Sequence, residues 1–170
     1  KGHSNRIFAI KFLPGEGNVL MSGGWDENIF FWDMRIGKTF ESINGPLISG
    51  DSIDFKDDKI LTGSYKTIQP LKIWDFKTFK LDHNIPWADP DEKEIALVYG
   101  AQFSKIDNKT ILSGCSGANQ VRLFNNGGEY LPLASISNIP KACYSVDFGN
   151  KSNSFVFAGG DGKIYITQKI

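Results

Sequence analysis

The feature that most constrains the fold of this sequence is a short strand-like pattern that ends in phenylalanine and occurs four times. The closing residues are Phe12, Phe55, Phe103 and Phe148, at intervals of 43, 48 and 45 residues. A period of this length is typical of one supersecondary unit that buries its apolar surface by stacking on neighbouring units. The chain is therefore expected to be an array of four similar units.

Each unit contains further strand patterns in a constant order. Two apolar residues, a small residue, a glycine and another small residue recur at 20–24, 60–64, 111–115 and 156–160. Dense apolar runs follow at 29–33, 71–75, 121–125 and 164–167. A weaker fourth strand is predicted at 38–43, 79–83 and 130–136, so the last unit lacks one. Turn residues such as Asp161-Gly162 separate the runs and no amphipathic helix is evident, which predicts an all-β chain.

The ends of the third strands resemble a known family. Trp32-Asp33 and Trp74-Asp75 close this strand in the first two units, and Gly2-His3 opens the first. With the period and the four strands per unit, these residues resemble the WD-repeat β-propeller family. The third unit departs from the pattern with Phe124-Asn125, and the fourth has Thr167 in place of Trp.

The resemblance implies a β-propeller of WD-repeat type with about four four-stranded antiparallel blades, the last without its outer strand. The blade boundaries expected from the repeats are 1–43, 44–84, 85–136 and 137–170. Because propellers close as rings, the chain is expected to be the C-terminal portion of a larger propeller. The missing blades would come from the same chain, or the ring would close by self-association or with another protein. An unclosed arc would leave apolar faces and a strand edge in water.

The resemblance also implies a structural hydrogen-bond tetrad in the first unit, made of His3, Ser22, Asp26 and Trp32. A buried Trp N–H and a buried His need polar partners, and a hydroxyl and a carboxylate supply them. The other blades are expected to depend on packing, with Thr62 and Trp74 as a remnant of the tetrad.

Alignment to the face with which the family binds its partners predicts a set of protein-binding residues. These are Arg6, Phe8, Trp25, Asp51, Tyr65, Tyr99 and Tyr144. Aromatic side chains and arginine are enriched at interface hot spots. The alternative for Phe8, Tyr99 and Tyr144 is that they are strand residues packed between blades.

Composition narrows the classes of partner and compartment. The 19 basic and 19 acidic residues give zero net charge, which argues against nucleic acid as a partner. No apolar run reaches the length of a membrane span, so no membrane insertion is expected. The two cysteines, Cys115 and Cys143, are predicted to be buried reduced thiols, which favours an intracellular, cytoplasmic protein.

The sequence favours a non-catalytic protein-protein interaction scaffold that presents an aromatic-rich face to a protein or peptide within a larger assembly. It contains no phosphate-binding glycine loop, nucleophile elbow or Cys-x-x-Cys motif. We therefore predict no catalytic, cofactor-binding or metal-binding residues, and no cofactor.

Two segments leave alternatives open. Trp32-Asp33-Met34-Arg35 resembles a pattern in WD-repeat substrate receptors of cullin-RING ubiquitin ligases, which makes such a receptor the alternative function. The other interpretation is that Arg35 lies on a solvated turn. The long connection 84–95 carries four carboxylates and Trp87. It is either a contact for a basic partner or a cation, or a solvated surface loop.

Overall fold

A computed structural model describes residues 2–15, 17–87, 94–107 and 109–168 of the chain. Within these ranges the protein consists of fifteen β-strands, and none of its elements is a helix able to cross a membrane. Four antiparallel sheets hold all of the strands. The all-β fold predicted from the repeats is therefore confirmed.

Each sheet is a meander in which strands adjacent in sequence pair with one another. The first contains β1 (Ile7–Phe12), β2 (Val19–Gly24), β3 (Asn28–Asp33) and β4 (Lys38–Asn44). The second contains β5 (Ile53–Lys56), β6 (Lys59–Gly63), β7 (Leu71–Asp75) and β8 (Leu81–Ile85). The third contains β9 (Ala96–Phe103), β10 (Thr110–Gly117), β11 (Val121–Asn125) and β12 (Pro132–Ile136). The last contains β13 (Cys143–Phe148), β14 (Ser154–Gly159) and β15 (Ile164–Gln168).

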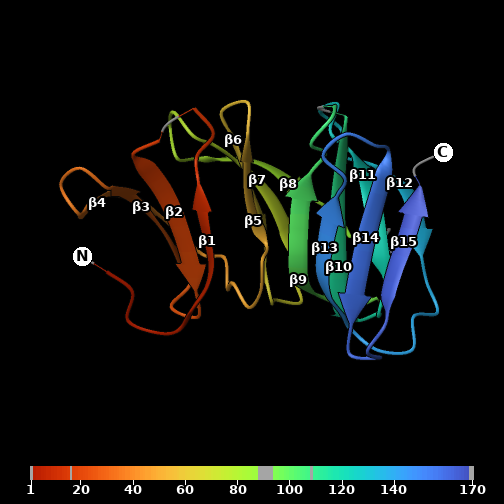
Figure 1. The fold of residues 1–170 in the computed structure, drawn as a ribbon. Helices are drawn as coiled ribbons and strands as arrows, with labels where there is room; N and C mark the ends of the chain where they lie inside the picture. Colours follow the sequence, from red (N-terminus) through yellow and green to blue (C-terminus); the bar gives the residue numbers. More distant parts are fainter. Residues whose placement is uncertain (1, 16, 88–93, 108, 169–170) are drawn as a thin grey trace.

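The sheets follow one another side by side in sequence order, from the red end to the blue end of Figure 1. The first strands of the sheets, β1, β5, β9 and β13, are neighbours along this row. The arrangement is an open arc of propeller-like blades, with the first and last sheets at opposite ends.

Apolar side chains fill the space between successive sheets. Met21 and Phe31 of the first sheet pack with Ile53 and Ile60 of the second. Equivalent clusters join the second sheet to the third and the third to the fourth. This explains the dense apolar runs of the second and third sheets, whose central strands are covered on both faces.

The recurring glycine of the second strand has a packing reason. A Cβ atom added to Gly63 would meet the Val98 side chain of the next sheet. One added to Gly114 would meet Cys143 and Val146. The blades approach closely at this strand, and only glycine leaves room there.

Two predicted strands begin later than expected. The outer strands predicted at 79–83 and 130–136 are Leu81–Ile85 and Pro132–Ile136. Phe79 and Tyr130 have positive φ angles of 55° and 51°, so both complete the preceding turns. Their aromatic side chains made them resemble strand residues, although the backbone there is left-handed.

Both ends of the arc expose apolar side chains. Ile10 and Phe12 of β1 are exposed at one end. Ile164 and Ile166 of β15 are 74% and 77% exposed at the other. Within the described strands β15 pairs with β14 alone, so its outer edge carries unpaired backbone groups.

Candidate protein-binding surface

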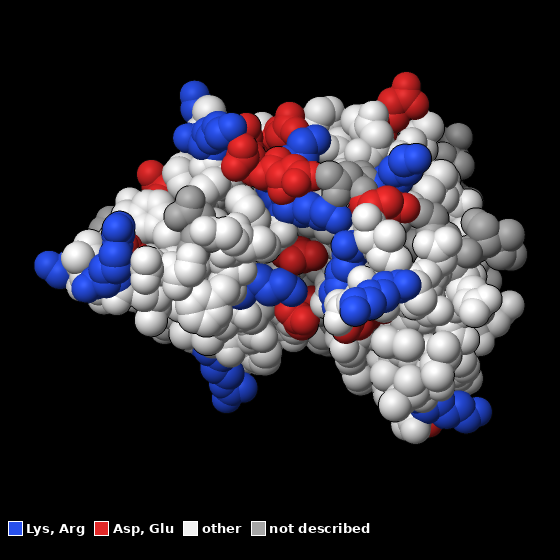
Figure 2. All heavy atoms as spheres, turned by 45° about the horizontal axis from the view of Figure 1, so that its top comes forward, with Lys and Arg blue, Asp and Glu red and all other residues white. Residues whose placement is uncertain are grey.

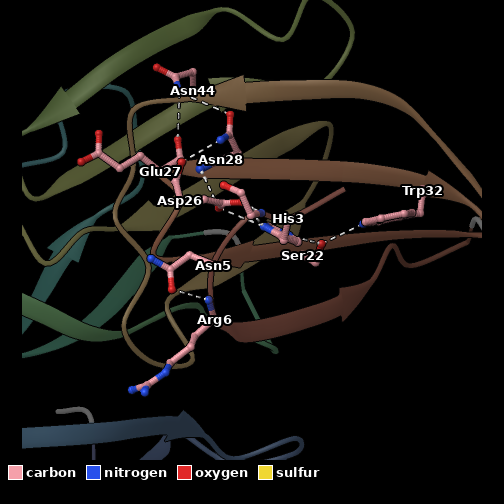
Figure 3. Close-up of polar contacts among 10 residues, drawn as sticks. His3, Asn5, Arg6, Ser22, Asp26, Glu27, Asn28, Trp32 and Asn44 are labelled. Atoms are coloured by element: carbon pink, nitrogen blue, oxygen red, sulfur yellow. Dashed lines mark hydrogen bonds and ion pairs between the residues drawn. The ribbon is translucent and has the colours of Figure 1, made fainter. Parts of the chain in front are cut away.

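The first sheet contains a chain of buried hydrogen bonds that starts from the segment before β1 (Figure 3). His3 Nδ1 lies 2.8 Å from Asp26 Oδ2, and His3 Nε2 lies 2.8 Å from Ser22 Oγ. Trp32 Nε1 donates to the same Ser22 oxygen at 2.7 Å. A neutral His3 protonated on Nδ1 satisfies all of these bonds, because the Ser22 hydroxyl then donates to Nε2 while it accepts from Trp32. The four residues of the expected tetrad are thus brought together.

The Asp26 carboxylate is held in its charged form. Burial raises its pKa, but the hydrogen bonds from His3 and from the Ser4 backbone N–H together lower it by more than burial raises it. The pKa of Asp26 therefore lies below its usual value. The His3 and Asp26 side chains are each 3% exposed. The network therefore ties the N-terminal segment to the first sheet and takes no part in an exposed site.

The other sheets use different polar ties. In the second, Trp74 Nε1 donates to Thr62 Oγ1 at 2.9 Å. In the third, the buried Arg122 pairs across the ladder with Ser113, as Phe30 pairs with Ser22 in the first sheet.

Arg122 is a structural residue that the sequence analysis missed. Its Nε donates to Gln120 Oε1 at 2.8 Å and its Nη2 to Glu94 Oε2 at 2.6 Å. The guanidinium also contacts the Trp87 carbonyl and lies 5.4 Å from the centre of the Trp87 ring. A charged residue inside an otherwise apolar run, 121–124, was the available signal.

The acidic connection 84–95 is therefore held in place by a contact near each of its ends. Trp87 is buried, and Glu94 is paired with Arg122. The other three carboxylates of the connection, Asp89, Asp91 and Glu92, lie outside the described residues. A role for them with a basic partner or a cation stays a prediction.

Three of the predicted binding residues occupy β-bulges. The ladder between the first two strands of a sheet shifts register between Ile7 and Ala9, and again between Cys143 and Ser145. The third sheet shifts between Gly114 and Cys115, whose ladder partners are Gly100 and Val98. The extra residues at these shifts are Phe8, Tyr144 and Tyr99. A bulge re-aims the side chain of the extra residue, so each ring leaves the alternation of its strand.

These rings contact other predicted residues and form what we call the aromatic row: Phe8, Trp25, Tyr65, Tyr99 and Tyr144. The Phe8 and Trp25 ring centres are 4.9 Å apart, and the Arg6 guanidinium lies 5.2 Å from the Trp25 ring. Tyr99 lies 5.2 Å from Tyr65 and 4.9 Å from Tyr144, with edge-to-face geometry in both pairs. The row therefore has two parts, one on the first sheet and one that crosses the other three.

The aromatic row is partly open to solvent. Phe8 and Trp25 are each 39% exposed and Tyr144 is 48% exposed, whereas Tyr65 and Tyr99 are half-buried. Burial and a hydrogen bond with Tyr65 raise the pKa of Tyr99 to about 12. The Trp25 indole N–H donates to Ser49 Oγ at 2.9 Å, which fixes the orientation of this ring.

Asp51 precedes β5 at the position that the bulged aromatics occupy in the other sheets, four residues before the closing phenylalanine. Its backbone oxygen accepts from the Ala101 N–H at 3.2 Å, and its Oδ2 lies 3.4 Å from Gln102 Nε2. The side chain is exposed. A carboxylate therefore stands in the second sheet at the position where the other sheets have a bulged aromatic ring.

The opposite ends of the first strands carry a different surface. The turns that follow β1, β5 and β9 line a cavity of about 570 Å³, and charged side chains gather around this hollow in Figure 2. Its lysines are used within the chain. Lys105 pairs with Asp147 at 2.5 Å, Lys11 pairs with Asp54 at 3.4 Å, and Lys56 Nζ donates to the Ser104 carbonyl. These contacts connect neighbouring sheets.

Arg35 lies on the turn after β3. Its Nε and Nη2 donate to the two oxygens of Asp33 at 3.0 and 2.6 Å. These bonds lower the pKa of Asp33 below its usual value. The guanidinium is exposed and is held in one orientation by its neighbour.

The cysteines are buried free thiols, as predicted. Burial raises the pKa of Cys115 to about 11 and that of Cys143 to about 12. Both are therefore protonated at neutral pH and are poor nucleophiles. In the described part of the chain, no group of three or more His, Cys, Asp or Glu side chains is placed to hold a metal ion.

Four consecutive meanders, stacked face to face around neighbouring first strands, define an array of propeller blades. The family model for the WD domain, G-beta repeat, matches residues 1–33, which contain the His3–Trp32 network. This match and the repeated four-stranded meanders support a WD-repeat protein.

Known proteins agree with this assignment. The chain is 27% identical to the Ribosome biogenesis protein WDR12 homolog of Trichoplax adhaerens over 99% of its own length and 38% of that protein. Pre-mRNA-processing factor 17 of Saccharomyces cerevisiae is 33% identical over 47% of the chain and 18% of the relative. Protein transport protein SEC31 of the same yeast is 28% identical over 52% of the chain and 8% of the relative. The chain thus spans less than half the length of each relative.

A solved structure shares the fold. The computationally designed Ika8 protein superposes with a TM-score of 0.75 over 99% of this chain and 48% of that chain, at 19% sequence identity.

Proposed function

We propose that this protein is a non-catalytic protein-protein interaction scaffold, and that the aromatic row with Arg6 and Asp51 binds a protein or peptide partner within a larger assembly. The observation that carries the proposal is the set of bulges that turn Phe8, Tyr99 and Tyr144 out of their strands. Packing alone does not require three blades to present an aromatic ring at the same position.

The geometry of the row supports this function. Its rings already contact one another, and a hydrogen bond to Ser49 holds Trp25 in place. Binding of a partner would therefore cost little side-chain entropy in the row. Large rigid rings that are partly exposed are typical anchors of protein interfaces. The charged surface at the other ends of the strands is engaged in contacts between sheets and is a weaker candidate.

The names of the relatives and the zero net charge of the chain support protein partners. The names of the relatives refer to ribosome biogenesis, pre-mRNA processing and protein transport. We propose an intracellular location, the cytoplasm in particular. We also propose protein partners instead of nucleic acid or membranes, because the zero net charge provides no excess of cations for phosphates.

The exposed apolar side chains at both ends of the arc favour further association. We propose that the chain forms the C-terminal portion of a propeller, and that additional blades of the same chain, or another copy, cover these faces.

The scaffold function is tested by replacing two anchors together, Trp25→Ala and Tyr65→Ala. Loss of these two aromatic anchors is expected to lower the affinity for the main partner by more than tenfold and to leave the fold intact. Quantitative affinity purification with cross-linking would measure this loss, and circular dichroism would check the fold.

The matched control for this test is Phe40→Ala, which removes an exposed aromatic ring from β4, outside the row. It is expected to retain every partner. Retention of all partners by the double variant would show that the aromatic row is not the binding surface.

A second candidate function, substrate receptor of a cullin-RING ubiquitin ligase, is favoured by the exposed and preoriented Arg35 in the Trp32–Arg35 segment. Under this proposal Arg35→Glu abolishes co-purification of the ligase adaptor, whereas Lys38→Glu does not. Unchanged adaptor binding by Arg35→Glu would exclude this function and leave the scaffold proposal standing.

A further inference from the structure

We infer that Asp51 and the rings beside it form a subsite for an arginine side chain of a protein partner. This inference rests on the proposed function, because it assigns chemistry to one position of the same surface. Asp51 stands at a position that holds an aromatic ring in the other three sheets.

The repeated position lies four residues before each closing phenylalanine. It holds Phe8, Asp51, Tyr99 and Tyr144 in the four sheets. Three of these residues are the extra residues of bulges, and the fourth, Asp51, lies two residues before the start of the short strand β5. The carboxylate therefore occupies the place of a ring in the row.

Backbone contacts place Asp51 directly beside Tyr99. Gly50 packs so closely on the Tyr99 carbonyl that a Cβ atom there would collide with it. The Asp51 carbonyl accepts from Ala101, two residues after Tyr99. Tyr99 in turn contacts Tyr65 and Tyr144, so the backbone of Asp51 lies beside a strand whose bulged tyrosine belongs to a group of three rings.

The charge of Asp51 is not neutralised within the described part of the chain. None of the ion pairs found there includes Asp51, and its described polar side-chain partner is the amide of Gln102 at 3.4 Å. Arg6 and Lys66 have partners other than Asp51. Arg6 stacks over Trp25, and Lys66 pairs with Glu27 at 2.6 Å. The surface therefore presents an exposed carboxylate that could pair with a cation of a partner.

Arginine fits this combination better than lysine does. Its planar guanidinium can stack on a tyrosine ring and donate two parallel hydrogen bonds to a carboxylate at the same time. Burial and the Tyr65 contact raise the pKa of Tyr99 to about 12, so this ring is neutral at physiological pH. The π-face of a neutral tyrosine ring attracts a cation.

The test uses two small probes of nearly the same shape, N-acetyl-arginine methylamide and its neutral analogue N-acetyl-citrulline methylamide. Each is titrated into the isotope-labelled protein and followed by amide chemical shifts. We expect the arginine probe to shift residues 51, 65 and 99 and to bind about tenfold more tightly than the citrulline probe, because one charge-assisted contact is lost.

The variant Asp51→Asn keeps the shape of the side chain and removes its charge. It is expected to reduce arginine binding about tenfold and to leave citrulline binding unchanged. Asp58→Asn is the control, because Asp58 is an exposed carboxylate in the turn after β5, at the opposite end of the same strand. It is expected to bind both probes like the wild-type protein.

Equal binding of the two probes, absence of shifts around Asp51, or full binding by Asp51→Asn would each overturn the arginine subsite. The scaffold proposal is judged separately by the Trp25 and Tyr65 double variant. If that variant loses its partner while Asp51→Asn retains it, the aromatic row is the binding surface and the arginine subsite is wrong.

Discussion

At the scale of single residues, the lowered pKa of Asp26 makes the stability of the fold depend on pH. Its carboxylate accepts from His3, from the Ser4 N–H and from the Asn28 N–H, and these bonds exist fully only for the charged form. Because its pKa in the folded protein is below the usual value of 3.8, ionisation of Asp26 stabilises the fold above that pH. This contribution is lost as the pH falls through the lower, folded value.

Asp26→Asn is therefore expected to lower the free energy of unfolding at pH 7 by about 2 kcal/mol, the scale of hydrogen bonds to a charged group. The difference from wild type should stay constant down to about pH 4 and shrink at lower pH. Urea unfolding at a series of pH values measures this.

Asp58→Asn is the control, because the Asp58–Lys77 pair lies on the surface, where such pairs contribute about 0–1 kcal/mol. A stability difference for Asp26→Asn that grows below pH 4 would contradict the account of this network.

Residues also differ in how far their roles can be predicted. His3, Ser22, Asp26 and Trp32 follow a family pattern, and the structure joins them in one network. Arg122 follows no such pattern. Its partners Trp87 and Glu94 come from a connection whose path no local sequence pattern determines, so the buried guanidinium was not foreseen.

At the scale of strands, the second-strand glycines of the second and third sheets, Gly63 and Gly114, allow the next sheet to approach closely. Gly114 faces Cys143 and Val146 of the last sheet, and a Cβ there would be too close to both side chains. Gly114→Ala is therefore expected to lower the free energy of unfolding by about 1–3 kcal/mol, because a packed interface must move apart. For a chain of this size, that is a fall in Tm of roughly 2–10 °C.

Thermal unfolding by calorimetry measures this effect. The matched control is Gly17→Ala, where an added Cβ meets no atom within 4 Å. A Tm for Gly114→Ala equal to that of the Gly17 variant would show that the interface has spare volume at Gly114.

Strand positions could be predicted from the repeats because apolar periodicity reflects burial on both faces. Strand starts such as Leu81 and Pro132 could not, because the φ angles of Phe79 and Tyr130 depend on the turn and not on hydrophobicity. The bulges at Phe8, Tyr99 and Tyr144 also leave no mark in the apolar pattern. The row could be proposed from alignment, but the reason its rings leave the strands appears only in the ladder register.

At the scale of the whole molecule, both ends of the arc expose large apolar side chains. Among the strands that the structure describes, none pairs with the outer edge of β15, and Ile164 and Ile166 add an apolar surface beside it. Such a strand is a template for pairing with another chain. At the other end, Ile10 and Phe12 offer an apolar face of the same kind.

The purified protein is therefore expected to self-associate in a concentration-dependent way, and the double variant Ile164→Lys, Ile166→Lys is expected to remain monomeric. Two positive charges on an edge strand oppose pairing with a second copy. Because these side chains are 74% and 77% exposed, the free energy of unfolding of the monomer should change by less than about 0.5 kcal/mol per substitution.

Sedimentation velocity over a wide concentration range measures this association. Ile68→Lys is the matched control, since Ile68 is 78% exposed but lies between β6 and β7, away from both ends of the arc. If the Ile68 variant and the β15 double variant associate equally, contacts other than the edge of β15 hold the copies together. If only the β15 variant becomes monomeric, the uncovered edge of the last sheet is the surface through which the arc is extended.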